Sequence, residues 1–373
     1  MNIVVLCPHF DPDTAPTGIV MTRLVQELSQ RGHRLHVVTA LPWYREHRIE
    51  PGWDGRYLRR VMTSFGTVTR VHPFPGGDRR NVARRALGFA GFCLLAGWAA
   101  LTAGRGSKNH KVDVVLAMSP PLPIGLVAWA VGVLRRAPMV FNVQDVFPDA
   151  AVETGAISNG AIIAVARWLE RVTYQSSRAV TVLSDDLADN VRAKMRPHRS
   201  NDVNMIPNFV DTVTIRPLDR LTAYRRELGI GAEQVVMYAG NVGLSQSLEL
   251  LVEAARQMPE VTFVINGDGS ARVALEASAR GLSNVRFGSY QPSERLAEVL
   301  ATGDVHVVPL KAGLGRVSVP SKTYSILAAG RPLVAAIDPG TEVPQILEAS
   351  GAGIAVEPDR AEPFIAALRT LLG

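Results

Sequence analysis

The chain has 373 residues, of which 47% are hydrophobic and 20% are charged. These fractions are typical of a folded globular protein and exclude a disordered chain, a collagen-like chain and a small scaffold held together by disulfides. The 40 Lys and Arg exceed the 34 Asp and Glu, which gives a formal net charge of +6. This mild excess suits nucleotide phosphates or acidic lipids as partners, and we expect no nucleic acid. At roughly 150 residues per domain, the length predicts two domains or three.

The N-terminal sequence MNIVVLCPHF predicts a first β-strand, because its apolar run is too short for a signal peptide and no basic residues precede it. The two cysteines, Cys7 and Cys93, each lie in an apolar run and have no metal-ligand spacing. We therefore expect both to be reduced core residues of a cytoplasmic protein.

Alternating strands and helices in the first half predict βα units with a parallel sheet. Thr17 is the expected N-cap of the first helix, and Gly32 is its expected stop. The segment 42–78 predicts one or two strands with loops. The other predicted strands are 3–7, 35–39, 112–118, 139–143 and 179–183, and the helices are 18–31, 124–134, 158–174 and 185–193.

The segment 86–104 carries no charged residue and is flanked on both sides by Arg and Lys. Its length is compatible with a membrane-spanning helix, although spanning would place the neighbouring strands on opposite sides of a bilayer. Its Gly and Ala content is typical of a helix buried against a sheet. As a third alternative, the helix and its basic flanks (79–111) make peripheral contact with an anionic membrane.

The second half repeats the alternation after a Pro-rich and Asn-rich segment, 206–217, which we interpret as a hinge. The predicted domains are therefore 1–205 and 218–373. The predicted strands are 234–239, 261–266, 285–287, 304–309 and 332–336. The predicted helices are 218–228, 248–257, 272–280, 293–301, 322–329, 341–349 and 363–372.

Ligands of parallel α/β sheets bind beyond the carboxyl ends of the strands, so the residues after each strand are candidate sites. The stretch 309–332 is the strongest candidate. It continues from a strand into a Gly-containing loop with Lys311 and Arg316, and then enters a helix through Ser321, the expected N-cap, and Lys322. Three cations near a helix N-terminus fit a nucleotide diphosphate. A capped surface helix with solvated lysines is the alternative.

Three further strand ends carry small or polar residues. In YAGNVGLSQS, Gly240 permits close approach of a phosphate, while Asn241 and Gln246 can donate hydrogen bonds; INGDGS adds Gly267. A plain βα turn explains these sequences equally well. In the first half, the candidate residues after strands are His9, Asp11 and Gly18, followed by Gln144 and Asp145, whose alternative role is capping.

Motifs for other chemistries are absent from the sequence. It contains no GxGxxG followed by an acidic residue, no Walker A sequence, no HExxH and no GxSxG, and no His, Cys and carboxylate cluster has metal-ligand spacing. Neither a nicotinamide cofactor nor a bound metal is therefore expected.

In their order, these motifs resemble those of the GT4 family of GT-B glycosyltransferases, over almost the whole chain. IPNFVD is similar to the family's hinge motif IPNGVD, and it is followed in the family's order by YAGNVG, INGDGS, GLSNVRFGSY, DVHVVPL and PSKTYSILAAGRPLVAA. The PSK and GN…Q variants are most similar to the branch for capsule, colanic-acid and O-antigen synthesis, which includes fucosyl- and amino-sugar transferases.

The resemblance implies a GT-B architecture, with two Rossmann-like α/β domains whose parallel sheets face a central cleft. It implies that a sugar is transferred with retention from a UDP- or GDP-linked donor on the second domain. The implied acceptor is a lipid-linked or related saccharide on the first domain, in cell-envelope polysaccharide or glycolipid synthesis. The resemblance further implies that no metal or other cofactor takes part, and that the protein is cytoplasmic or at the inner face of the plasma membrane.

The chain departs from the family pattern at several site positions. Asn241 and Gln246 stand where many members place Arg and Lys on the donor phosphates. Val317 and Ser325 stand at the paired glutamates, the second of which holds the ribose, and Gln144 lies near the usual active-site histidine. We expect Lys322 to take over the phosphate contact and to act with Asp145 in catalysis, and Ser325 to lie at the donor.

These departures leave two other functions open. The first is a catalytically inactive paralogue that binds sugar nucleotides. The second is a UDP-sugar epimerase of the same fold, for which the sequence offers few carboxylates and histidines to move protons.

Overall fold

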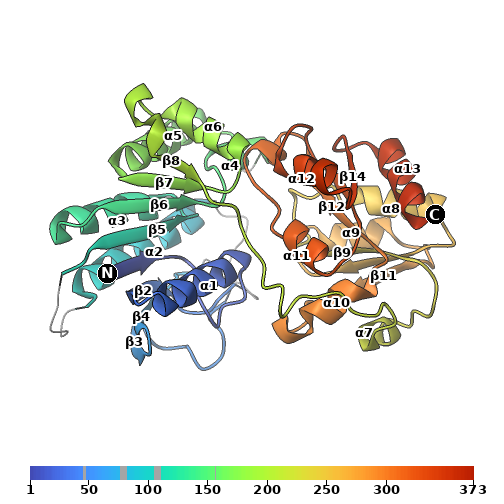
Figure 1. The fold of residues 1–373 in the computed structure, drawn as a ribbon, viewed down its shortest axis with the longest axis horizontal. Helices are drawn as coiled ribbons and strands as arrows, with labels where there is room; N and C mark the ends of the chain where they lie inside the picture. The colour runs from blue at the N-terminus through green and yellow to red at the C-terminus, as the bar shows by residue number, and fades with distance from the viewer. Residues whose placement is uncertain (45–47, 76–81, 105–110, 156) are drawn as a thin grey trace. The chain divides into compact units, whose positions relative to one another are not determined.

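The computed structural model describes residues 1–44, 48–75, 82–104, 111–155 and 157–373 (Figure 1). The chain divides into two units: Met1–Asp149 with Ile157–Pro207, and Ala150–Ala156 with Asn208–Gly373. The main boundary therefore falls within the segment 206–217 that the sequence suggests as a hinge. The sequence gives no sign that 150–156 belongs with the second unit.

The first unit is built on an eight-stranded sheet in the order β3-β4-β2-β1-β5-β6-β7-β8. β3 pairs antiparallel with β4, and all other neighbours are parallel. The strands are β1 (Asn2–Leu6), β2 (Arg34–Ala40), β3 (Leu58–Thr63), β4 (Gly66–Val71), β5 (Val114–Ser119), β6 (Met139–Val143), β7 (Ala179–Val182) and β8 (Val203–Met205).

Helices cover both faces of this sheet. Ile3, Val5 and Cys7 of the first strand segment pack with Met21 and Val25 of α1, while the alternate residues of β1 point to the other face, where α2 and α3 pack on the sheet. The helical segments of this unit are α1 (Pro16–Gln30), α2 (Val82–Thr102), α3 (Pro123–Arg135), α5 (Gly160–Ser176), α6 (Asp185–Lys194) and the 3₁₀ helix η1 (Pro197–Asp202). The short helix α4 (Asp149–Glu153) lies almost wholly in the segment assigned to the second unit.

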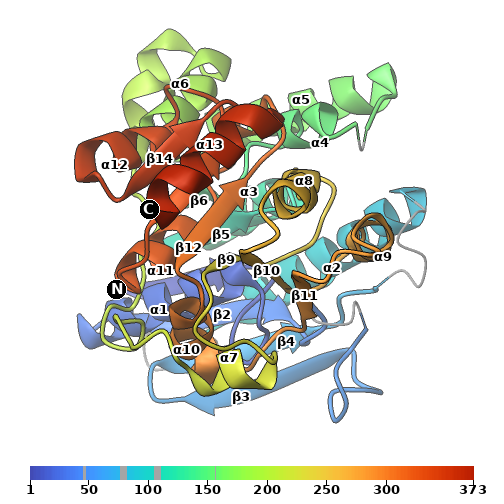
Figure 2. The ribbon, with the colours of Figure 1, turned by 90° about the vertical axis from the view of Figure 1, so that its right-hand side faces the viewer.

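The second unit contains a six-stranded parallel sheet in the order β11-β10-β9-β12-β13-β14 (Figure 2). The strands are β9 (Val235–Ala239), β10 (Thr262–Asn266), β11 (Val285–Gly288), β12 (Val305–Pro309), β13 (Leu333–Ala336) and β14 (Gly353–Val356). The helical segments are α7 (Ala223–Glu227), α8 (Glu249–Gln257), α9 (Arg272–Ser278), η2 (Ser293–Arg295), α10 (Leu296–Thr302), η3 (Leu314–Arg316), α11 (Lys322–Ala328), α12 (Glu342–Ser350) and α13 (Ala361–Leu372).

Alternating side chains of β9 contribute to two hydrophobic cores on opposite faces of the second sheet. Val236 and Tyr238 join the core beneath α8, α9 and α13. Val235 and Met237 join a smaller core that includes Tyr224 and Val299 of α7 and α10. The β9 sequence is therefore almost wholly apolar, as expected for a parallel strand covered on both faces.

Most predicted elements are confirmed within two or three residues, but five details of the prediction are wrong. Thr17 is not the cap of α1: Ala15 holds that position, and Pro16 begins the helix. The helix predicted at 218–228 is only Ala223–Glu227, because the Thr222 hydroxyl caps it by accepting from the Arg225 amide at 3.0 Å. The short strands β8 and β14 and the helix α4 are missing from the prediction.

The apolar segment forms α2, whose buried residues include Phe92, Cys93 and Ala96. Both cysteines are buried and free, as predicted. Among the described residues, no helix combines the length and the apolar character needed to cross a membrane. The predicted contact through 79–111 includes 79–81 and 105–110, which lie outside the described residues.

Candidate functional site

The order of strands in each sheet reverses at one point. In the second sheet β9 and β12 are neighbours, and the chain proceeds from β9 toward β11 on one side and from β12 toward β14 on the other. In the first sheet the corresponding neighbours are β1 and β5. Loops leave such a pair of strands in opposite directions, so their carboxyl ends are the expected ligand sites of a doubly wound sheet.

At the end of β9 the backbone passes too close to its neighbours for a side chain. Gly240 has φ 147° and Gly267 has φ 148°. A Cβ on Gly267 would lie 1.8 Å from the Gly240 carbonyl oxygen, and a Cβ on Gly240 would lie 2.8 Å from Lys322 Nζ. The two predicted glycines and the predicted lysine are thus brought together: Gly267 leaves room for the Gly240 backbone, and Gly240 leaves room for the ammonium group.

Lys322 is held by an aromatic residue that we did not predict as a site residue. Its Nζ donates a hydrogen bond of 2.8 Å to the Tyr238 hydroxyl and lies 4.0 Å from the centroid of that ring. The Tyr238 hydroxyl in turn donates to the Asn241 carbonyl. In the described part of the chain the Lys322 ammonium has no ion pair with a carboxylate.

The half-buried position of Lys322 changes its acidity. Burial lowers the pKa of Lys322 from 10.5 to about 7, because the charged form loses hydration that no carboxylate replaces. A phosphate placed beside this ammonium would supply the missing negative charge. An anionic ligand beside Lys322 would therefore favour its protonated form.

Two carboxylates hold the Gly-containing loop that follows β12. The Asp338 carboxylate accepts from the Gly313 and Gly315 amides at 2.9 Å each, and Asp359 accepts from the Ala312 amide at 3.0 Å. These carboxylates already bind the loop amides. Lys311 and Arg316 have exposed side chains, whereas Lys322 lies against the glycine backbone at the end of β9.

The other predicted donor-site residues have more limited roles in the structure. Ser321 is the N-cap residue of α11, as predicted, but it has helical backbone angles and its side chain makes no capping hydrogen bond. Ser325 lies one turn later and is half-buried. Gln246 Oε1 accepts from the Gly243 amide at 3.1 Å, and Asn241 is exposed in the same loop.

In the first unit, His9 follows β1 and forms a pair with a buried carboxylate. His9 Nδ1 and Asp13 Oδ2 are 2.7 Å apart, and the Asp13 side chain is fully buried. The His9 ring stacks on Trp43 at a centroid distance of 5.7 Å and meets the edge of Tyr44 at 5.4 Å. A histidine oriented by a carboxylate, with its other nitrogen available, is a typical hydrogen-bonding centre of a site.

The neighbours of His9 explain its placement. A Cβ on Gly18 would lie 3.0 Å from His9 Cβ, so glycine at the start of α1 allows the histidine to pack there. The Asp11 amide donates to Thr22 Oγ1 at 2.9 Å, and its carbonyl accepts from Arg70. The Asp11 side chain is exposed.

Gln144 and Asp145 follow β6, as predicted. Gln144 is buried and donates from Nε2 to the Asn142 side chain at 2.8 Å, whereas Asp145 is half-buried. Their backbone position at the carboxyl end of a strand beside β5 agrees with the prediction, but neither side chain identifies a reaction.

Sequence reasoning missed the residues that support the predicted ones. Asp13 could have been found as a carboxylate one helical turn from His9. Trp43 and Tyr44 lie in the segment that was hard to interpret, and Tyr238 and Asp338 read as ordinary strand and loop residues. Their roles depend on contacts between distant segments, which no local pattern records.

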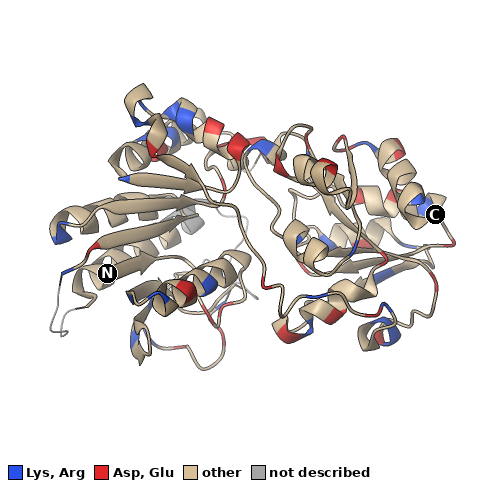
Figure 3. Ribbon diagram, viewed as in Figure 1, with Lys and Arg blue, Asp and Glu red and all other residues tan. Residues whose placement is uncertain are grey.

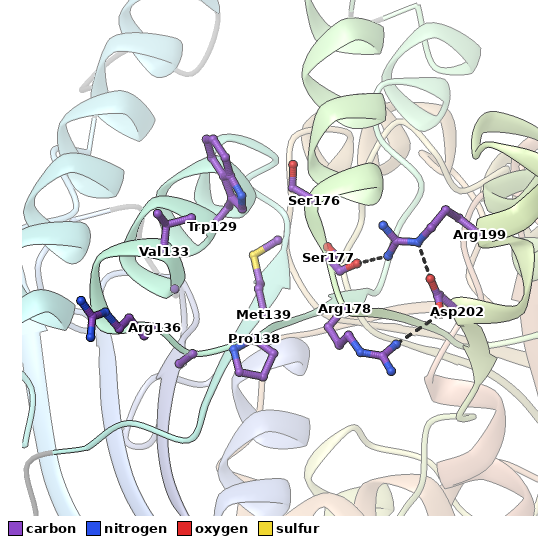
Figure 4. Close-up of a pocket in the computed structure, with 12 residues that line it drawn as sticks. Trp129, Val133, Arg136, Pro138, Met139, Ser176, Ser177, Arg178, Arg199 and Asp202 are labelled. Carbon is purple, nitrogen blue, oxygen red and sulfur yellow. Dashed lines mark hydrogen bonds and ion pairs between the residues drawn. The ribbon is translucent and has the colours of Figure 1, made fainter.

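A pocket of about 530 Å³ lies elsewhere, in the first unit (Figure 4). It is lined by Pro138 and Met139 at the start of β6, by Arg178 just before β7, and by Arg199. This is the amino edge of the sheet, opposite to the switch point, so we do not assign the predicted chemistry to it. In the described residues, no group of three or more His, Cys, Asp and Glu could hold a metal ion.

Two doubly wound parallel sheets, each with a polar constellation at its switch point, define the GT-B class of transferases. Two family models match the chain: a glycosyl transferase 4-like domain at residues 17–208 and glycosyl transferases group 1 at residues 233–373. The chain therefore belongs to the GT4-type glycosyltransferases with the GT-B fold, and it is a glycosyltransferase.

Similarity to individual proteins extends over the whole length. The chain is 26% identical over 384 residues to the putative colanic acid biosynthesis glycosyl transferase WcaI of Escherichia coli, covering 100% of this chain and 92% of that protein. Among solved structures, sucrose-phosphate synthase of Thermosynechococcus elongatus is similar with a TM-score of 0.75 at 16% identity, covering 100% of this chain and 90% of that one. Anabaena HepE in complex with UDP and glucose has a TM-score of 0.70 at 15% identity, with the same coverage.

Proposed function

We propose that this glycosyltransferase moves a sugar, with retention, from a UDP- or GDP-linked donor to a lipid-linked saccharide in the synthesis of a cell-envelope polysaccharide. It would act in the cytoplasm, at the inner face of the plasma membrane, without a bound metal or other cofactor. The donor diphosphate would bind at the carboxyl end of β9, and the acceptor would bind at the first unit.

One observation carries the proposal: the ammonium of Lys322, which lacks a carboxylate partner in the described chain, lies directly against the glycine backbone that ends β9. A leaving diphosphate needs compensation of its developing negative charge. In a metal-free site that charge must come from side chains and amides. Because Asn241 and Gln246 are neutral, Lys322 is the cation we assign to this role.

On the acceptor side, we propose that His9 binds an acceptor hydroxyl and that Asp13 orients it. The hydrogen bond between His9 Nδ1 and Asp13 leaves Nε2 to face a ligand. Aromatic rings beside a fixed polar group are typical of saccharide sites, and Trp43 and Tyr44 supply such rings.

The comparisons support the proposal at two points. The relative WcaI carries colanic acid biosynthesis in its name, and HepE of similar fold was solved with UDP and glucose bound. The base and the sugar of the donor are proposed only as a class, UDP- or GDP-linked.

The test is the binding of UDP and of GDP, measured by calorimetry, to the wild type and to Lys322→Ala. A hydrogen bond to a charged group contributes about 1.5–3 kcal/mol, so we expect the variant to bind the preferred nucleotide about 10- to 100-fold more weakly. Transfer of sugar should be lost in parallel.

The matched control is Arg280→Ala, which removes an exposed cation at the end of α9 in the same unit. It should bind like the wild type. Unchanged nucleotide affinity in Lys322→Ala would refute the role of Lys322. If neither nucleotide binds the wild type, the donor class is wrong.

A catalytically inactive paralogue is the second candidate function, and the residues at the family's glutamate positions favour it. Val317 is 4% exposed and belongs to the interior, and Ser325 cannot accept two ribose hydroxyls as a carboxylate does. Release of free sugar or its transfer from the bound donor by purified protein would exclude this candidate.

A further inference from the structure

The described surface of the first unit has large apolar side chains on three adjacent helices. Trp98 of α2 is 59% exposed, Trp129 of α3 is 42% exposed and Trp168 of α5 is 59% exposed. Three of the chain's five tryptophans thus face solvent. The exposed large apolar residues beside them are Leu87, Leu94, Val133, Leu134, Ile162 and Val165.

Glycines allow these three helices to pack closely side by side. A Cβ on Gly97 of α2 would lie 2.6 Å from Val127 Cγ1 of α3, and a Cβ on Gly125 of α3 would lie 2.2 Å from Thr173 Cγ2 of α5. Arg135 of α3 also donates to the Leu101 and Ala103 carbonyls at 2.7 and 3.0 Å, at the end of α2. Because α3 packs against both neighbours, we treat their outer side as one surface, the α2–α3–α5 face.

The side chains of α2 are distributed in an unusual way for a helix on a sheet. Its buried residues are mostly small, among them Ala96, Ala99 and Ala100, with Phe92 as a large exception, while Leu94 and Trp98 are exposed. An ordinary surface helix shows the reverse, with large apolar residues inside and polar residues outside. A contiguous apolar surface of this kind marks an interaction site.

The charge of the face has a single sign. α2 and α3 contain no Asp or Glu, and the one carboxylate of α5, Glu170, is buried and paired with Lys194 at 2.8 Å. Arg136, Arg167 and Arg171 are exposed, and within the described chain none of them is ion-paired. Figure 3 shows Lys and Arg at the end of α3, with no Asp or Glu on that helix.

The pocket of Figure 4 continues the face at the end of α3. Trp129 and Val133 form one wall, and Arg136 and Arg178 lie at its rim. Arg199 is held by Asp202 and by the Ser177 carbonyl. Arg178 pairs with the same Asp202 carboxylate at 3.5 Å, so the exposed Arg136 is the cation that extends the basic rim beyond the apolar helices.

We propose that the α2–α3–α5 face docks on an anionic lipid bilayer. Tryptophan is favoured at the membrane–water interface, where its ring contacts acyl chains and its N–H stays hydrated. Exposed arginines beside the rings would contact lipid phosphates, and each basic residue near an anionic surface contributes about 1 kcal/mol. The inference rests on the proposed function in one respect, since it places the enzyme where a lipid-linked acceptor resides.

Charge argues for a bilayer and against a second copy of this chain. Two copies meeting through the same face would bring arginines toward arginines, and the helices offer no exposed carboxylate to compensate. An anionic lipid surface satisfies the apolar and the basic residues together.

The experiment is co-sedimentation of the full chain with vesicles, without substrate. Phosphatidylcholine vesicles are compared with vesicles in which about one third of the lipid is phosphatidylglycerol, a content that gives a negative surface potential. We expect the wild type to bind the anionic vesicles with a blue shift of tryptophan fluorescence. A triple variant, Trp98→Ser, Trp129→Ser and Trp168→Ser, should bind at least tenfold more weakly, and Arg136→Gln with Arg167→Gln and Arg171→Gln should lose the preference for anionic lipid.

The matched control changes three other exposed apolar residues to serine, Met62, Val213 and Val273, and should bind vesicles like the wild type. Equal sedimentation of the tryptophan variant and the wild type would overturn the proposal. So would a wild-type dimer that the tryptophan changes convert to a monomer, with no vesicle binding. UDP and GDP binding is measured on the same samples, so failure of the proposed function shows there with vesicle binding intact.

Discussion

At the scale of single residues, the two site residues that we propose are each held by another side chain. Lys322 rests on Tyr238, and His9 rests on Asp13. The sequence marks both as candidates, since His9 follows a strand and Lys322 begins a helix, and doubly wound sheets bind ligands at such positions. Their supports could not be predicted, since a tyrosine in a strand and a carboxylate in a loop have many structural uses.

The pKa of Lys322 predicts how donor binding depends on pH. Burial lowers this pKa to about 7, so the ammonium of the free protein loses its proton as the pH rises through 7, while a bound diphosphate would keep it charged. Affinity for a UDP- or GDP-sugar should therefore fall as the pH rises above 7, approaching tenfold per pH unit. Calorimetry from pH 6 to pH 9 measures this, with a nucleotide-sugar because its phosphates do not titrate in that range.

Lys322→Arg provides the control for this pH dependence. The guanidinium stays charged throughout the range, so the affinity of this variant should not change with pH. A flat profile in the wild type would mean that the Lys322 ammonium does not face the phosphates.

The His9–Asp13 pair gives a second prediction at this scale. Asp13→Asn keeps the size of the side chain but removes the charge that orients the imidazole. We expect the rate of transfer to fall about tenfold or more at limiting acceptor, with UDP or GDP affinity unchanged. Steady-state kinetics with the acceptor varied, together with nucleotide calorimetry, separates the two effects.

Asp54→Asn, at an exposed carboxylate of the same unit, is the control and should transfer normally. Transfer by Asp13→Asn at the wild-type rate would remove Asp13 from the site. A parallel loss of nucleotide affinity would point instead to general unfolding.

At the scale of secondary-structure elements, close helix packing explains features that composition only suggested. The Gly and Ala content of α2 predicted a helix lying on a sheet, which the structure confirms. The length of α7 was less predictable. The Thr222 side chain caps α7 by a hydrogen bond and so sets where the helix begins. A single capping side chain does not change the hydrophobic periodicity, so the periodicity could not predict this boundary.

The contact between α3 and α5 predicts that one added methyl group lowers the free energy of unfolding by a measurable amount. Gly125→Ala would place its Cβ 2.2 Å from Thr173 Cγ2, and overpacking of this kind destabilises by about 1–3 kcal/mol. All five tryptophans lie in the first unit, so urea unfolding followed by tryptophan fluorescence reports on this unit.

The double variant Gly125→Ala with Thr173→Ala tests the cause. Removing the Thr173 methyl group should recover part of the lost free energy of unfolding, because the two positions are in contact. Gly160→Ala, where an added Cβ meets nothing within 4 Å, should not destabilise the protein. If Gly125→Ala lowers the free energy of unfolding by the same amount with and without Thr173→Ala, the packing explanation is contradicted.

At the scale of the whole molecule, the sequence contains enough regularity to predict two parallel α/β units. Every strand that the prediction assigned to a definite range was found, because buried parallel strands are continuous apolar runs bounded by turn residues. The omitted strands β8 and β14 lie at sheet edges and have half-exposed residues. The assignment of 150–156 to the second unit depends on contacts that are distant in sequence.

Asp338 and Asp359 have a kinetic consequence for the enzyme. By accepting from the amides of Ala312, Gly313 and Gly315 before any ligand arrives, they remove the conformational search that a loose loop would undergo during each encounter. Such preorganisation lowers the entropy lost on complex formation. The nucleotide-sugar would thus meet a surface that is already shaped, and turnover need not wait for this segment to order and release.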